Sequence, residues 1–379
     1  KQSRSWFRNI LVLFQFSIAI FLVASTLLVR SQMTLLMDES LGFNDQRVIL
    51  VRNAHYLDDE LGSFREELLG IPGITQVSVS SRVPGDGLVN WGFGAQDVDR
   101  GFSLNVNLVD EHYLEVMGME LVEGRFLSED YGSDTTKIIL NETAVNLLGY
   151  EDPVGKITYL WSDRERPLEV IGVVKDYFFE SKHREIRPHA LMHLGYPLGF
   201  RPEYLCIRVN SSQFEQTLDI LEKGWNERVA AIPFEFEFLD RHYEGIYQNE
   251  KQTRSLLYIF AAIAIFISCL GLFGLASFMA ERRTKEIGIR KTNGATTVSI
   301  LKLLSLDFTR WVLIANLIAW PLTWWVMKNW LENFAYRVPV SWWIFLGAGL
   351  LAFIIALATV SFHAVRASRL NPGISLRYE

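Results

Sequence analysis

Four long stretches without charged side chains dominate this sequence of 379 residues, at 10–29, 256–280, 311–327 and 342–365. A helix that crosses a membrane needs about 20 apolar residues to span about 30 Å of hydrocarbon. Three of the stretches reach that length. The stretch at 311–327 contains Asn316 and Pro321, lies at the short limit, and is expected to extend at both ends. The sequence therefore predicts a membrane protein with four transmembrane helices.

Two alternatives to transmembrane helices are buried helices of a soluble core and, for the first stretch, a cleaved signal peptide. Uncharged runs of about 18 residues or more are unusual in soluble cores. The stretch at 10–29 is longer than the apolar region of a signal peptide and lacks a clear cleavage site of small residues. Transmembrane helices explain all four stretches together.

Charge divides the chain in the same way. Residues 31–254 carry a net charge of −17, and the rest of the chain carries +11. Lysine and arginine are enriched on the cytoplasmic side of membrane helices. Such residues precede the first stretch and follow the second and the fourth, with Arg30 as a minor exception. Both termini and the loop at 281–310 are therefore predicted to be cytoplasmic, and 31–254 is predicted to lie outside.

The segment at 31–254 alternates short apolar runs typical of strands with helical patterns, which predicts a mixed α+β domain large enough for its own core. Strands are predicted at 47–51, 75–81, 137–140, 168–174, 204–209 and 234–239, and helices at 57–69, 111–117, 141–148 and 213–229. Asn141 is expected to cap the third of these helices. Residues 86–105 are rich in Gly and Asp, which favours turns and short strands.

Catalytic and cofactor motifs do not emerge from the sequence. It contains no phosphate-binding loop of the form GxxxxGK[ST] and no Ser–His–Asp arrangement in a known context. His183, His189 and His193 lie close in sequence, and His189 and His193 would share one face of a helix, but surface histidines are a better interpretation than a metal site. The acidic charge disfavours nucleic acid. We therefore expect no enzyme activity, no metal and no cofactor bound by this chain.

The loop after the second stretch is the most informative segment. Residues 281–296 alternate acidic and basic side chains around Ile287 and Ile289, and Asn293-Gly294 predicts a turn. Thr296 or Thr297 can then cap an amphipathic helix at 298–308 that continues into the third stretch. Binding to anionic lipid explains the basic residues, but it does not explain Glu281 and Glu286. This layout favours docking on a soluble partner.

Residues 281–296 resemble the coupling segment of the MacB/FtsX-type (type VII) ABC-transporter permeases. Further similar segments follow the family's order along nearly the whole chain: GRF at 124–126, NETA at 141–144, DPVGK at 152–156, VIGVVKD at 170–176 and NPGISLRYE at 371–379. The chain also resembles one half of the duplicated permeases of Bacteroidetes-like bacteria. The first residue, Lys1, fits a C-terminal half, and a stand-alone unit that forms homodimers is the alternative.

The resemblance implies a multi-pass protein of the bacterial inner membrane with a MacB-like periplasmic domain. Its parts would be the N-terminus and first helix at 1–30, the periplasmic domain at 31–254, the second helix at 255–280, the coupling helix and amphipathic elbow at 281–310, and the last two helices with the tail at 311–379. A separate ATPase dimer would use ATP and Mg²⁺, and its closure would move the helices and reshape the periplasmic domain, a mechanism called mechanotransmission. Other implied partners are a second permease half or copy, a periplasmic adaptor or substrate protein, and membrane lipid.

Two sets of residues are predicted to carry this function. In the ATPase-contacting segment the charges would give orientation and the isoleucines a buried anchor. Its residues are Arg282, Arg283, Lys285, Glu286, Ile287, Gly288, Ile289, Arg290, Lys291 and Gly294. Ala348, Ala352 and Ala356 recur every fourth residue in the last stretch, which permits close helix packing in lipid. Ordinary alanines of an apolar helix explain that spacing equally well.

Three classes of function compete at this point. An ABC-transporter permease that exports or extracts a drug, peptide or lipoprotein is the first. A non-transport protein, either an FtsX-like regulator of periplasmic hydrolases or a ligand sensor, is the second. A membrane-bound enzyme is the third, and it would need a catalytic cluster in 31–254 that the sequence does not show. The sequence does not identify the substrate.

Overall fold

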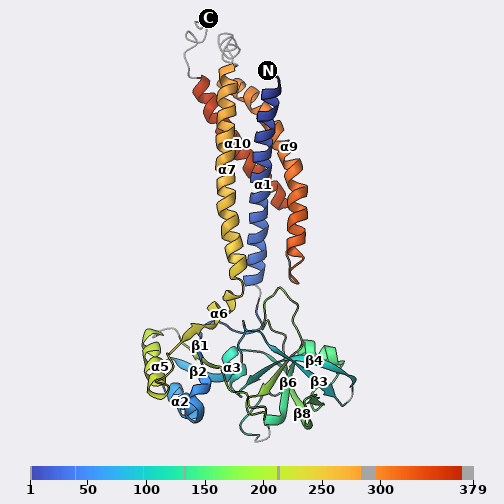
Figure 1. Cartoon of the computed structure of the whole chain (residues 1–379), viewed down its shortest axis with the longest axis vertical. Helices are drawn as coiled ribbons and strands as arrows, with labels where there is room; N and C mark the ends of the chain where they lie inside the picture. Colours follow the sequence, from blue (N-terminus) through green and yellow to red (C-terminus); the bar gives the residue numbers. More distant parts are fainter. Residues whose placement is uncertain are drawn as a thin grey trace. The chain divides into compact units, whose positions relative to one another are not determined.

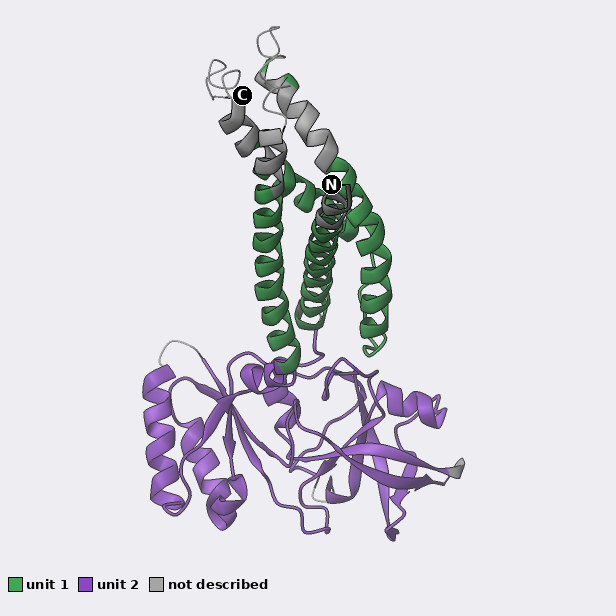
Figure 2. Cartoon of the chain, turned by 45° about the horizontal axis from the view of Figure 1, so that its top comes forward, with its two compact units in different colours: residues 1–38, 249–379 green, residues 39–248 purple. Residues whose placement is uncertain are grey.

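The computed structural model describes residues 2–38, 40–96, 98–131, 134–210, 214–282 and 296–368. The chain divides into two compact units, coloured separately in Figure 2. The helical unit contains residues 1–38 and 249–379, and the strand-rich unit contains residues 39–248. The strand-rich unit is therefore shorter than the predicted domain at 31–254. Residues 31–38 and 249–254 instead extend two long helices, because helical backbone hydrogen bonds do not depend on apolar side chains.

The described part of the helical unit consists of four long helices, drawn in Figure 1: α1 (Gln2–Asp38), α7 (Gln248–Arg282), α9 (Thr297–Leu331) and α10 (Trp342–Ser368). Among the described residues, three segments are long and apolar enough to cross a membrane: Ile10–Met37, Gln248–Gly274 and Trp342–Thr359. The third predicted span lies inside α9, where Asn316, Pro321 and five tryptophans lower the mean hydropathy. Three of the four predicted spans are thus supported by length and composition, and α9 stays a prediction.

Small and apolar side chains from all four helices form one core in the helical unit. It contains Val12, Phe16, Ile20, Ala24, Leu272, Val312, Ala315, Ala319, Phe345, Ala348, Ala352 and Ala356. Alanines at these positions allow the helix backbones to approach closely. The unit is therefore held by close packing of small residues as well as by large side chains.

The polar residues in these helices have defined places. A Cβ added to Gly271 of α7 would collide with the side-chain oxygen of Gln15, and one added to Gly349 would collide with that of Asn316. Gln32 is fully buried on α1, where its Nε2 donates to the carbonyl of Tyr336 (2.7 Å) and its Oε1 accepts from Val338 N–H (2.9 Å). The two hydrogen bonds of Gln32 satisfy its buried amide, which would be costly without partners, and join α1 to the segment between α9 and α10.

The strand-rich unit contains eleven described strands and several short helices, labelled in part in Figure 1. The strands are β1 (Val48–Arg52), β2 (Ile74–Ser80), β3 (Val89–Ala95), β4 (Val98–Val109), β5 (Leu121–Gly124), β6 (Lys137–Asn141), β7 (Ile157–Leu160), β8 (Asp163–Val174), β9 (His189–His193), β10 (Tyr204–Val209) and β11 (Phe236–Phe238). The helices are η1 (Ala54–Glu60), α2 (Leu61–Leu69), α3 (Tyr113–Met117), η2 (Asp134–Thr136), α4 (Glu142–Leu148), α5 (Phe214–Arg228) and α6 (Leu239–Gly245).

The strands form two connected regions. The first is an antiparallel arm in the order β11-β1-β10-β2, in which Leu50 pairs with Cys206. The second is a closed ring in the order β4-β3-β7-β8-β6-β9, because β9 pairs back onto β4 in parallel. The two regions join where Ser80 of β2 pairs with Val109 of β4.

Each region has its own core. The arm is covered by α2 and α5, whose Phe64 and Trp225 are buried against the apolar face of the arm strands. The indole N–H of Trp225 donates to the carbonyl of Ile232 (3.0 Å), which satisfies its polar atom. The ring encloses a second cluster that includes Phe93 and Met192. Burial of both clusters stabilises the unit through the hydrophobic effect.

Several local predictions are confirmed and others need correction. Asn141 caps α4, with its side-chain oxygen accepting from Ala144 N–H (3.0 Å). The predicted helix at 57–69 is interrupted at Asp58, whose φ of 42° breaks the helical geometry inside η1, before α2 begins at Leu61. Residues 86–105 contain not only turns but most of a long hairpin, in which Val89 of β3 pairs with Val106 of β4.

Segments that are far apart in the sequence meet around Asn141. Its Nδ2 donates to Asp176 Oδ1 (2.6 Å) and to the carbonyl of Arg187 (3.1 Å), while its Oδ1 also accepts from His189 N–H (2.7 Å). Asp176 in turn accepts from the backbone and hydroxyl of Thr143. The segments at 141–144 and 170–176 therefore form one hydrogen-bonded junction between β6 and β8.

Candidate functional site

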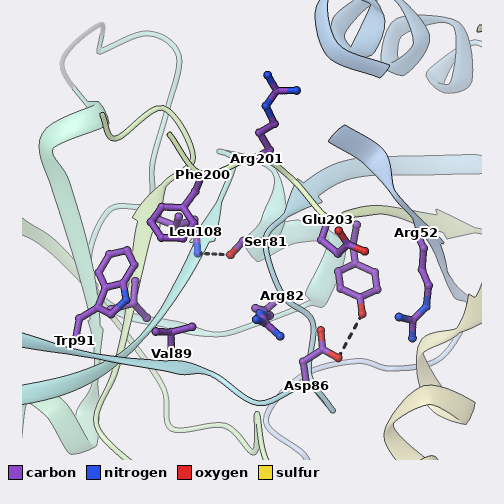
Figure 3. A pocket seen from close by; sticks show the side chains of 12 residues that line it. Arg52, Ser81, Arg82, Asp86, Val89, Trp91, Leu108, Phe200, Arg201 and Glu203 are labelled. Carbon is purple, nitrogen blue, oxygen red and sulfur yellow. Dashed lines mark hydrogen bonds between the residues drawn. The ribbon is translucent and has the colours of Figure 1, made fainter. Parts of the chain in front are cut away.

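The strand-rich unit contains an open cleft of about 390 Å³, shown in Figure 3. It is lined by Arg52, Ser81, Arg82, Asp86, Val89, Trp91, Val106, Leu108, Phe200, Arg201, Glu203 and Tyr204. These residues come from the arm strands β1 and β10, from the hairpin β3–β4, and from the segments that precede β3 and β10. The pairing of β2 with both β10 and β4 brings them together.

One end of the cleft is charged and hydrogen-bonded. Tyr204 donates its hydroxyl to Asp86 Oδ1 (3.3 Å), and the guanidinium carbon of Arg52 lies 5.4 Å from the centre of the Tyr204 ring. Burial opposes ionisation of Asp86, but hydrogen bonds, first from His242, outweigh it and lower the pKa of this carboxyl below its ordinary value. Asp86 is therefore an anion with its partners in place.

The other end of the cleft is apolar. The rings of Trp91 and Phe200 lie 5.3 Å apart, and Figure 3 shows Val89 and Leu108 beside them. Phe200 is 44% exposed and Val89 is 42% exposed, whereas Leu108 is buried. Exposed aromatic and branched side chains around a buried floor offer a surface on which an apolar group can be removed from water.

A second polar cluster surrounds Glu111. Its Oε1 lies 3.1 Å from Nε2 of His112 and 3.5 Å from Nη1 of Arg65, and its Oε2 lies 3.6 Å from Nε2 of His193. The hydrogen bond from His193 is the first cause that holds the pKa of Glu111 at about 2. The carboxylate is therefore ionised and surrounded by three cationic or donor groups.

The ligand atoms of Glu111, His112 and Glu129 lie within 4.8 Å of one another, close enough for a metal ion. The backbone N–H of Gly195, however, donates to Nδ1 of His193 (2.8 Å), so the neutral ring carries its proton on Nε2, toward Glu111. Both oxygens of Glu111 already face donors, and one of these is the cation of Arg65. The arrangement fits an ion-pair network better than a metal centre.

The prediction that His189 and His193 share a helix face is wrong, because both lie on strand β9. Neither ring nitrogen of His189 has a hydrogen-bond partner in the described part of the chain, and burial lowers its pKa to about 4. Its ring packs against Tyr177 and Phe179, so it is a neutral core side chain, and the prediction of a surface histidine is wrong at this position. His183 bonds to the hydroxyl of Ser181 and stacks on Tyr247. The three histidines do not converge.

Comparison with known proteins decides the family. The family model of the MacB-like periplasmic core domain matches residues 10–213, and that of the FtsX-like permease C-terminal domain matches residues 258–372. The first match covers more than half of the chain. The chain belongs to the MacB/FtsX family of ABC-transporter permeases. As a member of a permease family it belongs in a membrane, with a periplasmic core domain at the strand-rich unit.

Individual relatives of this MacB/FtsX-family chain are distant. The macrolide export ATP-binding/permease protein MacB of Aggregatibacter actinomycetemcomitans is 25% identical over 210 residues, which cover 53% of this chain and 32% of MacB. The uncharacterized ABC transporter permease YknZ of Bacillus subtilis is 23% identical over 326 residues, which cover 82% of this chain and 77% of YknZ. This chain thus spans about a third of MacB and most of YknZ.

Two solved structures are similar in part. The periplasmic region of MacB from Actinobacillus actinomycetemcomitans covers 56% of this chain and 98% of its own length, with 16% identity and a TM-score of 0.41. The extracellular domain of YknZ from Gram-positive bacteria covers 46% of this chain and 86% of its own length, with 19% identity and a TM-score of 0.35.

Most of the predicted ATPase-contacting residues of this permease lie outside the described residues: Arg283, Lys285, Glu286, Ile287, Gly288, Ile289, Arg290, Lys291 and Gly294. Arg282 is the last residue of α7. On the other side of the segment, Thr296 caps α9, with its hydroxyl accepting from Ser299 N–H (3.3 Å). The coupling assignment therefore stays a prediction. The segment itself lies between the end of α7 and the capped start of α9.

The structure places the three predicted packing alanines inside the helical core. Ala348 is fully buried, and Ala352 and Ala356 are at most 9% exposed. They pack with residues of α1 and α9 in one cluster. The cleft residues, in contrast, were not singled out by sequence reasoning. They carry no common motif, and only the strand pairing assembles them.

Proposed function

We propose that this chain is the permease subunit of an ABC transporter in the bacterial inner membrane, and that it transmits the closure of a separate ATPase dimer to its periplasmic domain. The ATPase would bind ATP and Mg²⁺ and would hold two copies or two halves of such a permease. Export or extraction of a substrate from the outer face would follow from the shape change of the periplasmic domain.

The observation that carries this proposal is the continuity of α7. This helix is 35 residues long, contains no proline, and runs from Gln248, the last residue of the strand-rich unit, to Arg282, where the predicted coupling segment begins. An unbroken helix resists bending, so a displacement at one end reaches the other. After that segment, Thr296 caps the start of a second long helix, α9.

The first experiment tests ATPase docking. The double substitution Glu286→Arg with Ile287→Arg reverses one charge and removes one apolar anchor of the predicted segment. We expect co-purification of the ATPase with the permease to be lost, while the permease itself stays folded by circular dichroism. Normal recruitment of the ATPase by this variant would show that the segment is not the docking site.

The second experiment tests force transmission. Thr253 and Ser255 are exposed residues of α7 before its apolar part. Glycine at both positions loosens the helix by about 1 kcal/mol per site relative to alanine. We expect the double glycine variant to recruit the ATPase but to lose the ATP-dependent change in hydrogen exchange of residues 39–248, whereas the double alanine variant keeps it. Equal exchange in both variants would contradict transmission through α7.

A further inference from the structure

The cleft of the strand-rich unit contains positive charge that its own carboxylates do not neutralise. Within the described part of the chain, Arg82 and Arg201 form no ion pair, and both are exposed. Figure 3 shows Arg82 between the apolar and the charged ends of the cleft. An exposed guanidinium without a carboxylate partner is available for a bidentate bond to an anion.

The acidic residues of the cleft are already engaged. Asp86 accepts from Tyr204 and lies 3.2 Å from Nε2 of His242. Glu203 lies 3.5 Å from Nδ1 of His55. The lining contains three arginines and two carboxylates, so the cleft presents net positive charge within a segment, 31–254, whose net charge is −17. Such a local reversal of sign favours an anionic group at this position over the rest of the surface.

The neighbouring apolar end requires a second feature in the ligand. Trp91 and Phe200 form a tilted pair above the buried Leu108, so an aromatic or aliphatic group can pack there. The walls are too exposed to enclose a free small molecule, which usually loses most of its surface to its pocket. They suit a segment of a longer chain. Trp, Tyr and Arg are also the residue types that dominate binding energy in protein interfaces.

We infer that this cleft binds a peptide segment of another protein in which a carboxylate side chain lies next to an aromatic or aliphatic one. Arg82 holds the carboxylate, and the pair Trp91–Phe200 holds the apolar side chain. Arg201 points away from Arg82 in Figure 3 and adds positive charge to the same cleft. The inference concerns the strand-rich unit alone. It stands whether or not an ATPase drives the helices, so its failure and that of the proposed function are distinguishable.

Binding is measured by fluorescence polarisation with the whole chain in detergent and dye-labelled, end-capped peptides that alternate glutamate and phenylalanine. Two matched peptides carry glutamine for glutamate or serine for phenylalanine. We expect each matched peptide to bind about tenfold more weakly, the loss expected for one charge-assisted hydrogen bond or one buried aromatic contact. No binding by the glutamate–phenylalanine peptide, or equal binding of all three, overturns the inference.

Variants locate the site. The double variant Arg82→Gln with Arg201→Gln should lose the preference for glutamate, and Phe200→Ser should lose the preference for phenylalanine. Arg164→Gln is the matched control, because Arg164 is an exposed arginine of β8 outside the cleft. An equal loss of binding in the Arg164 variant would show general electrostatic attraction and overturn the inference.

An anionic lipid offers a related charge, and vesicles of phosphatidylglycerol test it as a competitor. We expect them to leave peptide binding unchanged within about twofold at physiological salt, where exposed charges are screened beyond about 8 Å. Displacement of the peptide by the vesicles, dependent on Arg82 and Arg201, would assign the cleft to lipid and overturn the peptide assignment.

Discussion

Nε2 of His242 lies 3.2 Å from Oδ1 of Asp86. Nδ1 of the same ring lies 3.0 Å from Oε2 of Glu237, so one imidazole joins α6, β11 and the wall of the cleft. The ring is only 11% exposed. Two carboxylates on opposite nitrogens favour the doubly protonated imidazolium, since only that form donates from both nitrogens.

This contact predicts a pH dependence of stability. The hydrogen bond with Asp86 is the first cause that raises the pKa of His242 above its ordinary 6.5, against the effect of burial. A raised pKa of a cation stabilises the folded state below the unfolded pKa, and this contribution is lost as the pH rises through the folded value. The lowered pKa of Asp86 adds stability above its ordinary 3.8, which is lost as the pH falls through the folded value.

We therefore expect the unfolding free energy of the strand-rich unit to fall as the pH rises from below 6.5 through the raised pKa of His242. His242→Gln should flatten this dependence. Thermal unfolding of the chain in detergent, followed together with hydrogen exchange of residues 39–248, measures both. The same slope in the wild type and the variant would contradict the assignment.

Asn141 supplies a second prediction. Asn141→Ala removes the cap of α4 and the bonds to Asp176, Arg187 and His189 at once. We expect a loss of about 3 kcal/mol in the unfolding free energy of the strand-rich unit, from one cap and several buried partners. Asn146→Ala is the control, because Asn146 is an exposed residue of the same helix and its replacement should change stability by less than about 0.5 kcal/mol.

Two glycines should respond to alanine with opposite signs. A Cβ on Gly172 of β8 would collide with the carbonyl of Arg125, which predicts a destabilisation of about 1–3 kcal/mol. Gly62 of α2 has nothing within 4 Å of the added Cβ, so Gly62→Ala should stabilise by about 0.5–1 kcal/mol. Chemical unfolding monitored by hydrogen exchange compares them. Stabilisation by Gly172→Ala would show that β5 and β8 approach less closely than described.

The packing alanines of α10 give the last prediction. Ala352→Leu inserts a large side chain into the core shared with α1 and α9 and should cost about 1–3 kcal/mol. Ala358 is exposed on the same helix, and Ala358→Leu should be close to neutral. Thermal unfolding in detergent separates the two. Equal midpoints would favour the interpretation of 348, 352 and 356 as ordinary alanines of an apolar helix.

Local sequence patterns predicted a large part of this architecture. The uncharged runs gave long helices, and Asn141 was recognised as a cap because capping depends only on the residues that follow it. Sequence patterns failed where the local structure depends on strand pairing or on a backbone dihedral angle. His189 and His193 have the spacing of a helix face, but pairing with β4 and β6 holds them in a strand. Asp58 ends a helical pattern because its backbone adopts a positive φ that side-chain periodicity does not reveal.

The sequence by itself determined the family, the division into apolar helices and an acidic domain, and the expected orientation of the chain in the membrane. Each of these depends on the composition and motifs of continuous segments. Only the tertiary structure decided that the strands close into a ring and an arm, and that Arg52, Arg82, Trp91, Phe200 and Tyr204 line one cleft. The physical reason is that strand pairing joins residues more than a hundred positions apart through backbone hydrogen bonds, whose partners leave no periodic mark in the sequence.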